Sequence, residues 1–295
     1  MRMPVSDYYP PSIAAAMSPP NAQNSIVFVG GGNMARSLIG GMLERGTAAS
    51  SIVVSEPFPE ARSALATRFG IQVGSNNTEA AANANTLVLA VKPQVMRDVC
   101  ASIRESLPAD AVVVSIAAGI TCQQLDDWLG GGRAVVRCMP NTPALVGAGA
   151  TGIFANANTS EAQLERAQAL MRAVGITVRI HDESLMDVVT ALSGSGPAYV
   201  FLLAQAMQAG AEAQGLPPAA ARVLTAQTLF GASRMLIEDA EDAAALRARV
   251  TSPGGTTQAA VETLQFGGFE ALLASAIQAA TTRGRELARA AEGAA

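Results

Sequence analysis

Short apolar runs alternate with helix-like segments along the first part of the chain. Between Ser25 and about Ile180 these runs are rich in β-branched residues. Continuous apolar runs are typical of strands that are buried on both faces of a parallel sheet. The expected strands are Ile26–Val29, Ile52–Ser55, Leu87–Val91, Val112–Ile116, Val135–Cys138 and Thr177–Ile180.

Helices are expected between several of these strands, and each ends at a glycine. They are Met34–Arg45 before Gly46, Glu60–Phe69 before Gly70, and Glu161–Val174 before Gly175. Glycine is common just past a helix because it adopts the left-handed conformation readily. Ser160 and Gln163 have the spacing of a capping box at the start of the last helix. The alternation predicts a doubly wound α/β fold.

After His181 the strand signal stops and helical segments remain. The expected helices are Leu185–Leu192, Pro197–Gln214, Ala219–Glu238, Thr257–Gln265 and Phe269–Ala291. The helix from Pro197 is apolar around much of its circumference, which is more than a small helical domain can bury by itself. The sequence therefore predicts an α/β domain over residues 25–181, and an all-helical domain over 182–295 that pairs with a second subunit.

Composition narrows the classes of function. The net charge of −4 argues against nucleic acid or an anionic membrane as a partner. No uninterrupted apolar run reaches the roughly 18 residues of a membrane span, and the best candidate, Pro197–Met207, is interrupted by Gln205. Residues 1–24 are proline-rich and lack the basic start and apolar block of a signal peptide. We therefore expect a disordered tail on a soluble, cytoplasmic protein.

Few side chains are available for acid–base, metal or thiol chemistry. The three cysteines, Cys100, Cys122 and Cys138, form no CxxC pair, which fits reduced, buried thiols in a cytosolic protein. His181 is the only histidine, so a histidine-based metal site or a Ser-His-Asp triad is not expected. Any mechanism that needs a catalytic lysine must use Lys92, the only lysine in the chain.

The first expected strand is followed by Gly30-Gly31-Gly32-Asn33-Met34-Ala35, a GxGxxA sequence. Gly30 permits a tight turn, Gly32 lets the backbone approach a pyrophosphate, and Ala35 allows close packing of helix and strand. The following helix would direct its free N–H groups at the phosphates. Such a turn can be purely structural, but its place in a βαβ unit favours dinucleotide binding.

The second expected strand ends at Ser55-Glu56, and Glu56 lies 24 residues after Gly32. An acidic residue near this place commonly holds the ribose 2′-OH of NAD, and it would repel the 2′-phosphate of NADP. In the alternative, Glu56 turns to solvent while Ser55 and Arg62 bind a phosphate. The sequence leaves both interpretations open, and with them the preference for NADH or NADPH.

Three further loops follow strands and therefore reach the ligand-binding edge of the sheet. They are Val91-Lys92-Pro93-Gln94, Ser115-Ile116-Ala117-Ala118-Gly119 and Met139-Pro140-Asn141-Thr142-Pro143. Their small residues leave room for a flat nicotinamide, and Asn141 can bond a carboxamide or a ribose. Each loop alone could be an ordinary turn, but their joint placement favours a common crevice.

Two glycine- and hydroxyl-rich segments precede helices in the helical domain. They are Ser193-Gly194-Ser195-Gly196-Pro197-Ala198 and Thr251-Ser252-Pro253-Gly254-Gly255-Thr256-Thr257. Such loops present N–H groups and hydroxyls to an anion without adding net charge. Either could be a plain turn between helices, yet the presence of two favours a carboxylate-binding site.

The chain resembles the pyrroline-5-carboxylate reductases from about Ser25 to Ala291. The motifs that carry the resemblance are GGGNMA, VKPQ, SIAAG, MPNTPA, ALSGSGPAYVF and SPGGTT, in that order. The resemblance implies a Rossmann domain followed by a helical dimerisation domain. It also implies NAD(P)H-dependent reduction of 1-pyrroline-5-carboxylate to L-proline, the last step of proline biosynthesis, and homodimers that in some relatives assemble into decamers.

The resemblance and the loop positions together give the candidate site residues. By resemblance, Asn33, Met34, Ala90, Lys92 and Asn141 contact the NADPH or NADH cofactor. Position in the fold adds Gly30, Gly32, Ala35, Ser55, Glu56, Val91, Pro93 and Ala117. The substrate would be held by Ser193, Gly194, Ser195, Gly196, Pro197, Ser252, Gly254, Gly255, Thr256 and Thr257. The resemblance places Thr257 near the ring nitrogen of the substrate, where it would be the catalytic residue.

The sequence departs from many relatives of this family at two places. Glu56 stands where many relatives carry a residue more favourable to NADPH, which leaves the cofactor preference open. The segment Glu241-Asp242-Ala243 differs from the His-Pro at the last two of these positions in many relatives.

Other functions remain as alternatives. A β-hydroxyacid dehydrogenase would need a catalytic lysine on a helix in the middle of the chain, whereas Lys92 is on a Rossmann loop. A short-chain dehydrogenase would need Tyr-xxx-Lys, and none of Tyr8, Tyr9 and Tyr199 has a lysine four residues on. A non-catalytic dinucleotide sensor would have no use for two carboxylate-binding loops.

Overall fold

The computed structural model of the chain describes residues 25–293. The expected tail over residues 1–24 lies outside the described residues. Within the described part the chain forms two compact units. One, the sheet unit, contains residues 25–194 and 280–293, and the other, the helical unit, contains residues 195–279. The predicted domain boundary after His181 stays a prediction.

The sheet unit is built on an eight-stranded sheet. Its strands in chain order are β1 Ile26–Val29, β2 Ile52–Ser55, β3 Gln72–Gly74, β4 Thr86–Leu89, β5 Val112–Ser115, β6 Ala134–Met139, β7 Gly149–Ala155 and β8 Gly175–Arg179. In space they follow the order β3-β2-β1-β4-β5-β6-β7-β8, and β6 with β7 is the one antiparallel pair. The expected doubly wound α/β fold is therefore confirmed.

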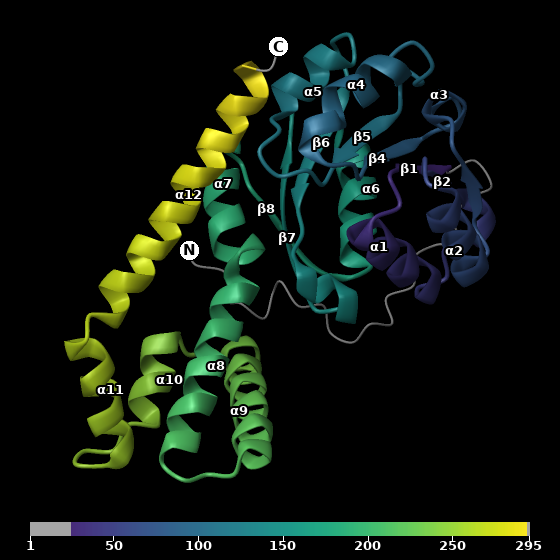
Figure 1. Ribbon diagram of the computed structural model, residues 1–295. Coiled ribbons are helices and arrows are strands. Elements are labelled where there is room, and N and C mark those ends of the chain that lie inside the picture. The colour runs from purple at the N-terminus through teal and green to yellow at the C-terminus, as the bar shows by residue number, and fades with distance from the viewer. Residues whose placement is uncertain (1–24, 294–295) are drawn as a thin grey trace. The chain divides into compact units, whose positions relative to one another are not determined.

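Helices cover both faces of this sheet (Figure 1). The helices are α1 Asn33–Glu44, α2 Pro59–Phe69, α3 Asn77–Ala81, α4 Pro93–Ile103, α5 Cys122–Trp128, α6 Glu161–Arg172 and α7 Met186–Val189. The 3₁₀ turns are Ala49–Ser51, Thr142–Val146 and Glu183–Leu185, and a π-turn spans Thr190–Gly194. Helices α1, α2 and α6 pack on one face, and α3, α4 and α5 pack on the other.

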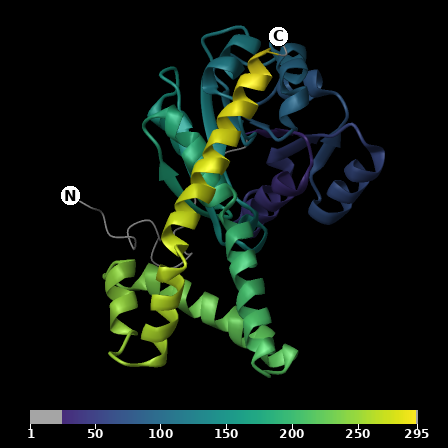
Figure 2. The ribbon, with the colours of Figure 1, turned by 60° about the vertical axis from the view of Figure 1, so that its left-hand side comes forward.

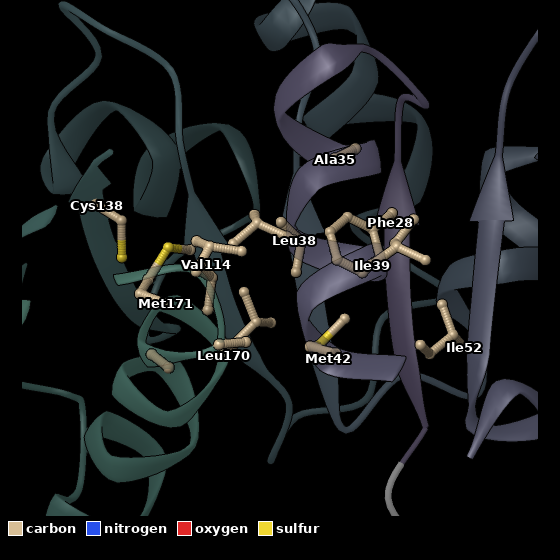
Figure 3. Packing of buried hydrophobic residues seen from close by; sticks show 14 of the residues in the cluster. Phe28, Ala35, Leu38, Ile39, Met42, Ile52, Val114, Cys138, Leu170 and Met171 are labelled. Atoms are coloured by element: carbon tan, nitrogen blue, oxygen red, sulfur yellow. The ribbon is translucent and has the colours of Figure 1, made fainter. Parts of the chain in front are cut away.

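The core explains why the central strands are mostly apolar. Leu38 and Ile39 of α1 are fully buried against the β1 side chain Phe28, while Met171 of α6 packs near Val114 of β5 (Figure 3). Burial of this kind is the main stabilising term in folding. All three cysteines are part of the two core clusters, as expected. Burial raises the pKa of the Cys100 thiol to about 12.

Some elements were not predicted from the sequence. Strand β3 is a short edge strand that contains Gln72 and Gly74, and β7 contains small residues instead of an apolar run. Helices α3, α4 and α5 and the helix Ala243–Arg249 were also missed. The fourth strand ends at Leu89, two residues earlier than expected, so Ala90 and Val91 belong to the loop that follows it.

The helical unit contains α8 Gly196–Ala213, α9 Pro218–Glu238, α10 Ala243–Arg249 and α11 Thr256–Phe266. Helix α12 Phe269–Gly293 begins in this unit, and its residues from 280 onward group with the sheet unit. Helices α8 and α9 pack against each other (Figure 2). Asp242, which belongs to the segment Glu241-Asp242-Ala243, caps α10 by accepting the Ala245 N–H.

The helical unit exposes many large apolar side chains. Helix α8 has no buried residue, and Phe201 and Leu202 on it are 69% and 66% exposed. Phe266 at the end of α11 is 98% exposed. In the described residues, the helical stretch Glu183–Ala213 is also long and apolar enough to cross a membrane by length and composition alone. No such stretch was expected from the sequence, because Gln205 interrupts its longest apolar run.

Candidate active site

The loops that follow the central strands begin at one edge of the sheet. Val29 pairs with Ser55 and with Leu89, Leu89 pairs with Ser115, and Ser115 pairs with Arg137. The carboxyl ends of five strands therefore lie in one row. Strand β1 lies between β2 and β4, which is the point where the strand order reverses direction. Ligands of open α/β sheets bind in the crevice outside the strand ends at this point.

The glycine turn after β1 has the geometry expected for a nucleotide. Gly30 has φ +99°, and a Cβ there would lie 2.7 Å from the Ala90 carbonyl oxygen, so a larger residue does not fit. Gly32 precedes α1 without any side-chain cap, and a Cβ on it would meet nothing within 4 Å. No side chain at the N-cap position therefore blocks the first N–H groups of α1, and these groups are suited to bind a pyrophosphate.

The other predicted cofactor residues lie around this turn or on the neighbouring loops. Ala35 is buried against the core, whereas Asn33 is exposed and Met34 is half-buried. Lys92 is exposed directly before α4, which begins at Pro93. The remaining loop residues Ala90, Val91 and Ala117 have partly or fully buried side chains at the same edge.

Glu56 faces the glycine turn and not the solvent. Its carboxylate accepts the Gly31 N–H at Oε2 (2.9 Å) and the Phe58 N–H at Oε1 (3.2 Å), and the residue is 8% exposed. The interpretation in which Glu56 turns to solvent therefore does not describe this structure. A carboxylate against the glycine turn is close to where the ribose of a dinucleotide lies in this fold.

The two residues of the alternative phosphate site are engaged with other groups. Arg62 donates from Nη1 to the carbonyls of Glu56 and Pro57, both at 2.8 Å. The Ser55 hydroxyl donates to Asn77 Oδ1 at 2.6 Å. These contacts leave Glu56 as the charged group nearest the glycine turn on this loop.

Asn141 and Ser193 join two of the predicted loops within the sheet unit. The Asn141 amide donates from Nδ2 to the Ser193 carbonyl (3.0 Å), and its Oδ1 accepts the Ala150 N–H (2.9 Å). The Ser193 hydroxyl donates to the Val189 carbonyl (3.0 Å). Ser193 and Gly194 end the π-turn, and Ser195, Gly196 and Pro197 open α8 in the helical unit.

The second predicted loop lies in the helical unit and opens α11. Gly255 is the N-cap residue and makes no side-chain cap, and Thr256 is the first residue of the helix. Gly254 has φ +73°, and its N–H donates to Gln258 Oε1 (2.7 Å). Thr257 is half-buried in the first turn of the helix. Because Gly255 occupies the cap position, capping does not account for Thr257.

One buried charged group near the strand ends was not predicted from the sequence. Arg137 of β6 is 4% exposed and lies between Glu183 Oε1 (3.3 Å) and Asp187 Oδ1 (3.5 Å). Glu183 Oε1 also accepts the Cys122 N–H at 2.7 Å. An arginine inside an otherwise apolar strand was the available signal, because a buried charge needs partners.

The glycine turn, the open N-terminus of α1 and the loops at the point of strand reversal together define a dinucleotide-dependent oxidoreductase. Comparison with known proteins agrees with this class. Residues 25–119 match the family model described as NADP oxidoreductase, coenzyme F420-dependent, and residues 183–287 match that of pyrroline-5-carboxylate reductase dimerisation.

Individual relatives narrow the class to one family. A pyrroline-5-carboxylate reductase of Pseudomonas aeruginosa is 51% identical over 89% of this chain and 96% of that protein. The Escherichia coli pyrroline-5-carboxylate reductase is 37% identical over 90% of this chain and 99% of that protein. The chain belongs to the pyrroline-5-carboxylate reductase family, as its motifs predicted.

Solved structures of similar proteins have the same fold. A pyrroline-5-carboxylate reductase from Coxiella burnetii is 40% identical, has a TM-score of 0.86, and the match covers 90% of this chain and 98% of that one. The Plasmodium falciparum pyrroline carboxylate reductase, solved with NADP bound, is 26% identical with a TM-score of 0.80, and the match covers 90% of this chain and 98% of that one.

Proposed function

We propose that the protein reduces 1-pyrroline-5-carboxylate to L-proline with NADH or NADPH, the last step of proline biosynthesis. The observation that carries this proposal is the 51% identity to a pyrroline-5-carboxylate reductase over almost the full length of that protein. Both loops suited to a carboxylate substrate are present, and the glycine turn has the shape that a dinucleotide needs.

The cofactor site consists of the glycine turn and the loops at the carboxyl edge of the sheet. Gly32 and the first turn of α1 bind the pyrophosphate through backbone N–H groups. Glu56 faces the adenosine ribose, and the loops with Ala90, Lys92 and Ala117 surround the nicotinamide. When bound, the nicotinamide supplies a hydride. The full proposed set is Gly30, Gly32, Asn33, Met34, Ala35, Ser55, Glu56, Ala90, Val91, Lys92, Pro93 and Ala117.

The substrate site needs little acid–base machinery. A protonated imine is already electrophilic, and when its carbon accepts a hydride the π-electron pair moves to the ring nitrogen and gives the amine of proline. Thr257 donates a hydrogen bond to that nitrogen as the pair develops. The N–H groups and hydroxyls of Ser193–Pro197 and Ser252–Thr257 hold the carboxylate, so orientation supplies most of the rate effect.

An assay for proline formed from 1-pyrroline-5-carboxylate tests this function. With NADH or NADPH present, proline and oxidised dinucleotide should form in equal amounts. Oxidation of small β-hydroxyacids without proline formation would favour a β-hydroxyacid dehydrogenase instead. Binding of the dinucleotide without turnover of either substrate would indicate that the protein is a non-catalytic dinucleotide sensor.

Glu56→Ser should shift the preference toward NADPH. The variant removes a negative charge next to the expected 2′-phosphate, a repulsion of about 1 kcal/mol, or roughly fivefold. It also removes the acceptor of the Gly31 and Phe58 N–H groups, so KM for NADH should stay the same or worsen while KM for NADPH falls. The ratio of kcat/KM for the two cofactors measures the effect, and an unchanged ratio would show that Glu56 does not face the ribose.

We also propose a cytoplasmic homodimer, formed by the dimerisation and substrate domain over residues 182–295, while residues 25–181 bind the dinucleotide. The match to a dimerisation model over residues 183–287 supports this assembly, and so do the exposed apolar residues of α8, α9 and α11. A dimer accounts for the apolar stretch Glu183–Ala213 without a membrane. From the family resemblance we further propose that these dimers assemble into decamers.

Phe201→Asp should dissociate the dimer. An obligate interface usually buries more than about 2,000 Å² and tolerates no unpaired charge at its centre. Sedimentation should show a dimer for the unchanged chain and a monomeric or unfolded species for the variant. Phe58→Asp is the control, since Phe58 is also 69% exposed but belongs to the sheet unit. A folded, active monomer of the unchanged chain at low concentration would contradict the proposal.

A further inference from the structure

Both polar atoms of the Asn141 side chain are bonded to backbone groups of its own unit. Its Oδ1 accepts the N–H of Ala150 in β7 (2.9 Å), and its Nδ2 donates to the carbonyl of Ser193 (3.0 Å). The residue is only 9% exposed. One side chain therefore ties together the loop after β6, strand β7 and the end of the π-turn Thr190–Gly194.

The π-turn needs a partner of this kind. Carbonyl groups at the end of a helical segment lack intrahelical N–H partners, and a buried carbonyl without a partner is costly. Ser193 meets that need through Asn141, 52 residues earlier in the chain. Because a hydrogen bond is directional, this bond also fixes the position and orientation of the end of the turn relative to the loop that carries Asn141.

Other contacts of the π-turn and of the helix before it include two local hydrogen bonds, from the Ser193 hydroxyl to the Val189 carbonyl (3.0 Å) and from the Thr190 hydroxyl to the Met186 carbonyl (2.9 Å). Packing contacts and a salt bridge add to these. A Cβ on Gly194 would lie 2.7 Å from Met139 Cε, and a Cβ on Gly152 would lie 2.5 Å from Val189 Cγ1, so these pairs touch closely. Asp187, before the turn, pairs with Arg137 at 3.5 Å. The Asn141 amide, by contrast, comes from a distant segment and bonds the backbone carbonyl of Ser193 itself.

We propose that Asn141 is a positioning residue for the substrate loop, and not a ligand of the carboxamide or ribose of the cofactor as expected from the sequence. It acts through Ser193, whose carbonyl it holds, and so sets where the segment Ser193–Pro197 begins. The proposal rests on the proposed function, since it takes that segment as part of the carboxylate site. It predicts that Asn141 matters to the affinity for the imino acid and not to that for the dinucleotide.

A matched control exists at the opposite end of the same strand pair. Asn156 follows β7 as Asn141 follows β6, and it also bridges two backbone groups. It donates from Nδ2 to the Arg133 carbonyl (2.9 Å) and accepts the Val135 N–H (3.1 Å), and its Oδ1 also accepts the Thr159 hydroxyl (2.8 Å). Removal of the Asn156 side chain should therefore cost at least as much stability as removal of Asn141, but of the two only Asn141 is bonded to the substrate loop.

The test compares Asn141→Ala, Asn141→Ser and Asn156→Ala with the unchanged full-length protein. Melting curves, NADH and ADP-ribose titrations, and steady-state kinetics are measured on each. Both Asn141 variants should raise KM for 1-pyrroline-5-carboxylate by about tenfold, the effect of one lost buried hydrogen bond. Their affinities for NADH and ADP-ribose should change by less than about twofold. Asn156→Ala should lower the melting temperature and leave the kinetics unchanged.

Two results would overturn the proposal. Weaker binding of NADH would make Asn141 a cofactor ligand: a ligand of the nicotinamide if binding of ADP-ribose, which lacks the nicotinamide, is unchanged, and a ligand of the ribose if binding of ADP-ribose weakens as well. A lower melting temperature with unchanged KM and kcat would leave it a purely structural residue. If Asn141→Ala does not fold, the same measurements on Asn141→Ser distinguish these outcomes. Failure of the proposed function is separate, because then the unchanged protein forms no proline at all.

Discussion

Thr257→Val is expected to lower turnover by roughly 30- to 1,000-fold, equivalent to about 2–4 kcal/mol of transition-state stabilisation. Valine keeps the shape of threonine and removes the hydroxyl that is proposed to donate to the ring nitrogen. The hydrogen bond strengthens as the electron pair moves onto that nitrogen, so its loss acts on kcat. Steady-state kinetics with saturating cofactor measure the effect.

Thr256→Val is the control for this substitution. Thr256 begins α11 and is exposed, whereas Thr257 is half-buried, and its replacement should change turnover much less. Folding and dinucleotide affinity should survive in both variants, because the cofactor residues belong to the sheet unit. A Thr257→Val protein that is fully active but about 1 kcal/mol less stable would remove this residue from the mechanism and leave it a structural part of the helix start.

Gly32→Ala is expected to weaken binding of NADH and NADPH by roughly 5- to 150-fold, the effect of about 1–3 kcal/mol of steric overlap with the pyrophosphate. The methyl group would point into space that is open in this structure, because a Cβ there meets no atom within 4 Å. The backbone at Gly32, with φ −69° and ψ −175°, suits any residue. The free protein should therefore keep its stability or gain up to about 1 kcal/mol.

Gly30→Ala provides the contrast two residues earlier. Gly30 has φ +99°, and its added Cβ would lie 2.7 Å from the Ala90 carbonyl oxygen, so this variant should lose about 1–3 kcal/mol of stability. Cofactor titration and melting curves distinguish the two effects. Normal NADH affinity in Gly32→Ala would mean that the pyrophosphate does not lie over this turn.

The elements of the sheet unit were predictable wherever a local pattern specifies them. Strands β1 and β2 have the predicted bounds, because their apolar runs are buried on both faces. The capping box of Ser160 and Gln163 is present at α6. Strand β7 was missed because its residues are small and because it is held by pairing with β6 and β8, which a local window does not contain.

The sequence by itself determined the family, the order of the motifs and the place of the glycine turn after β1. These depend on residues that are neighbours in the chain, such as Gly30 to Ala35. Only the tertiary structure decided what the side chains of the site face. Glu56 meets Gly31 across 25 residues, Arg137 meets Asp187 across 50, and Asn141 meets Ser193 across 52. The reason is physical: a hydrogen bond or ion pair of this kind forms only once the sheet register has brought distant segments to one edge.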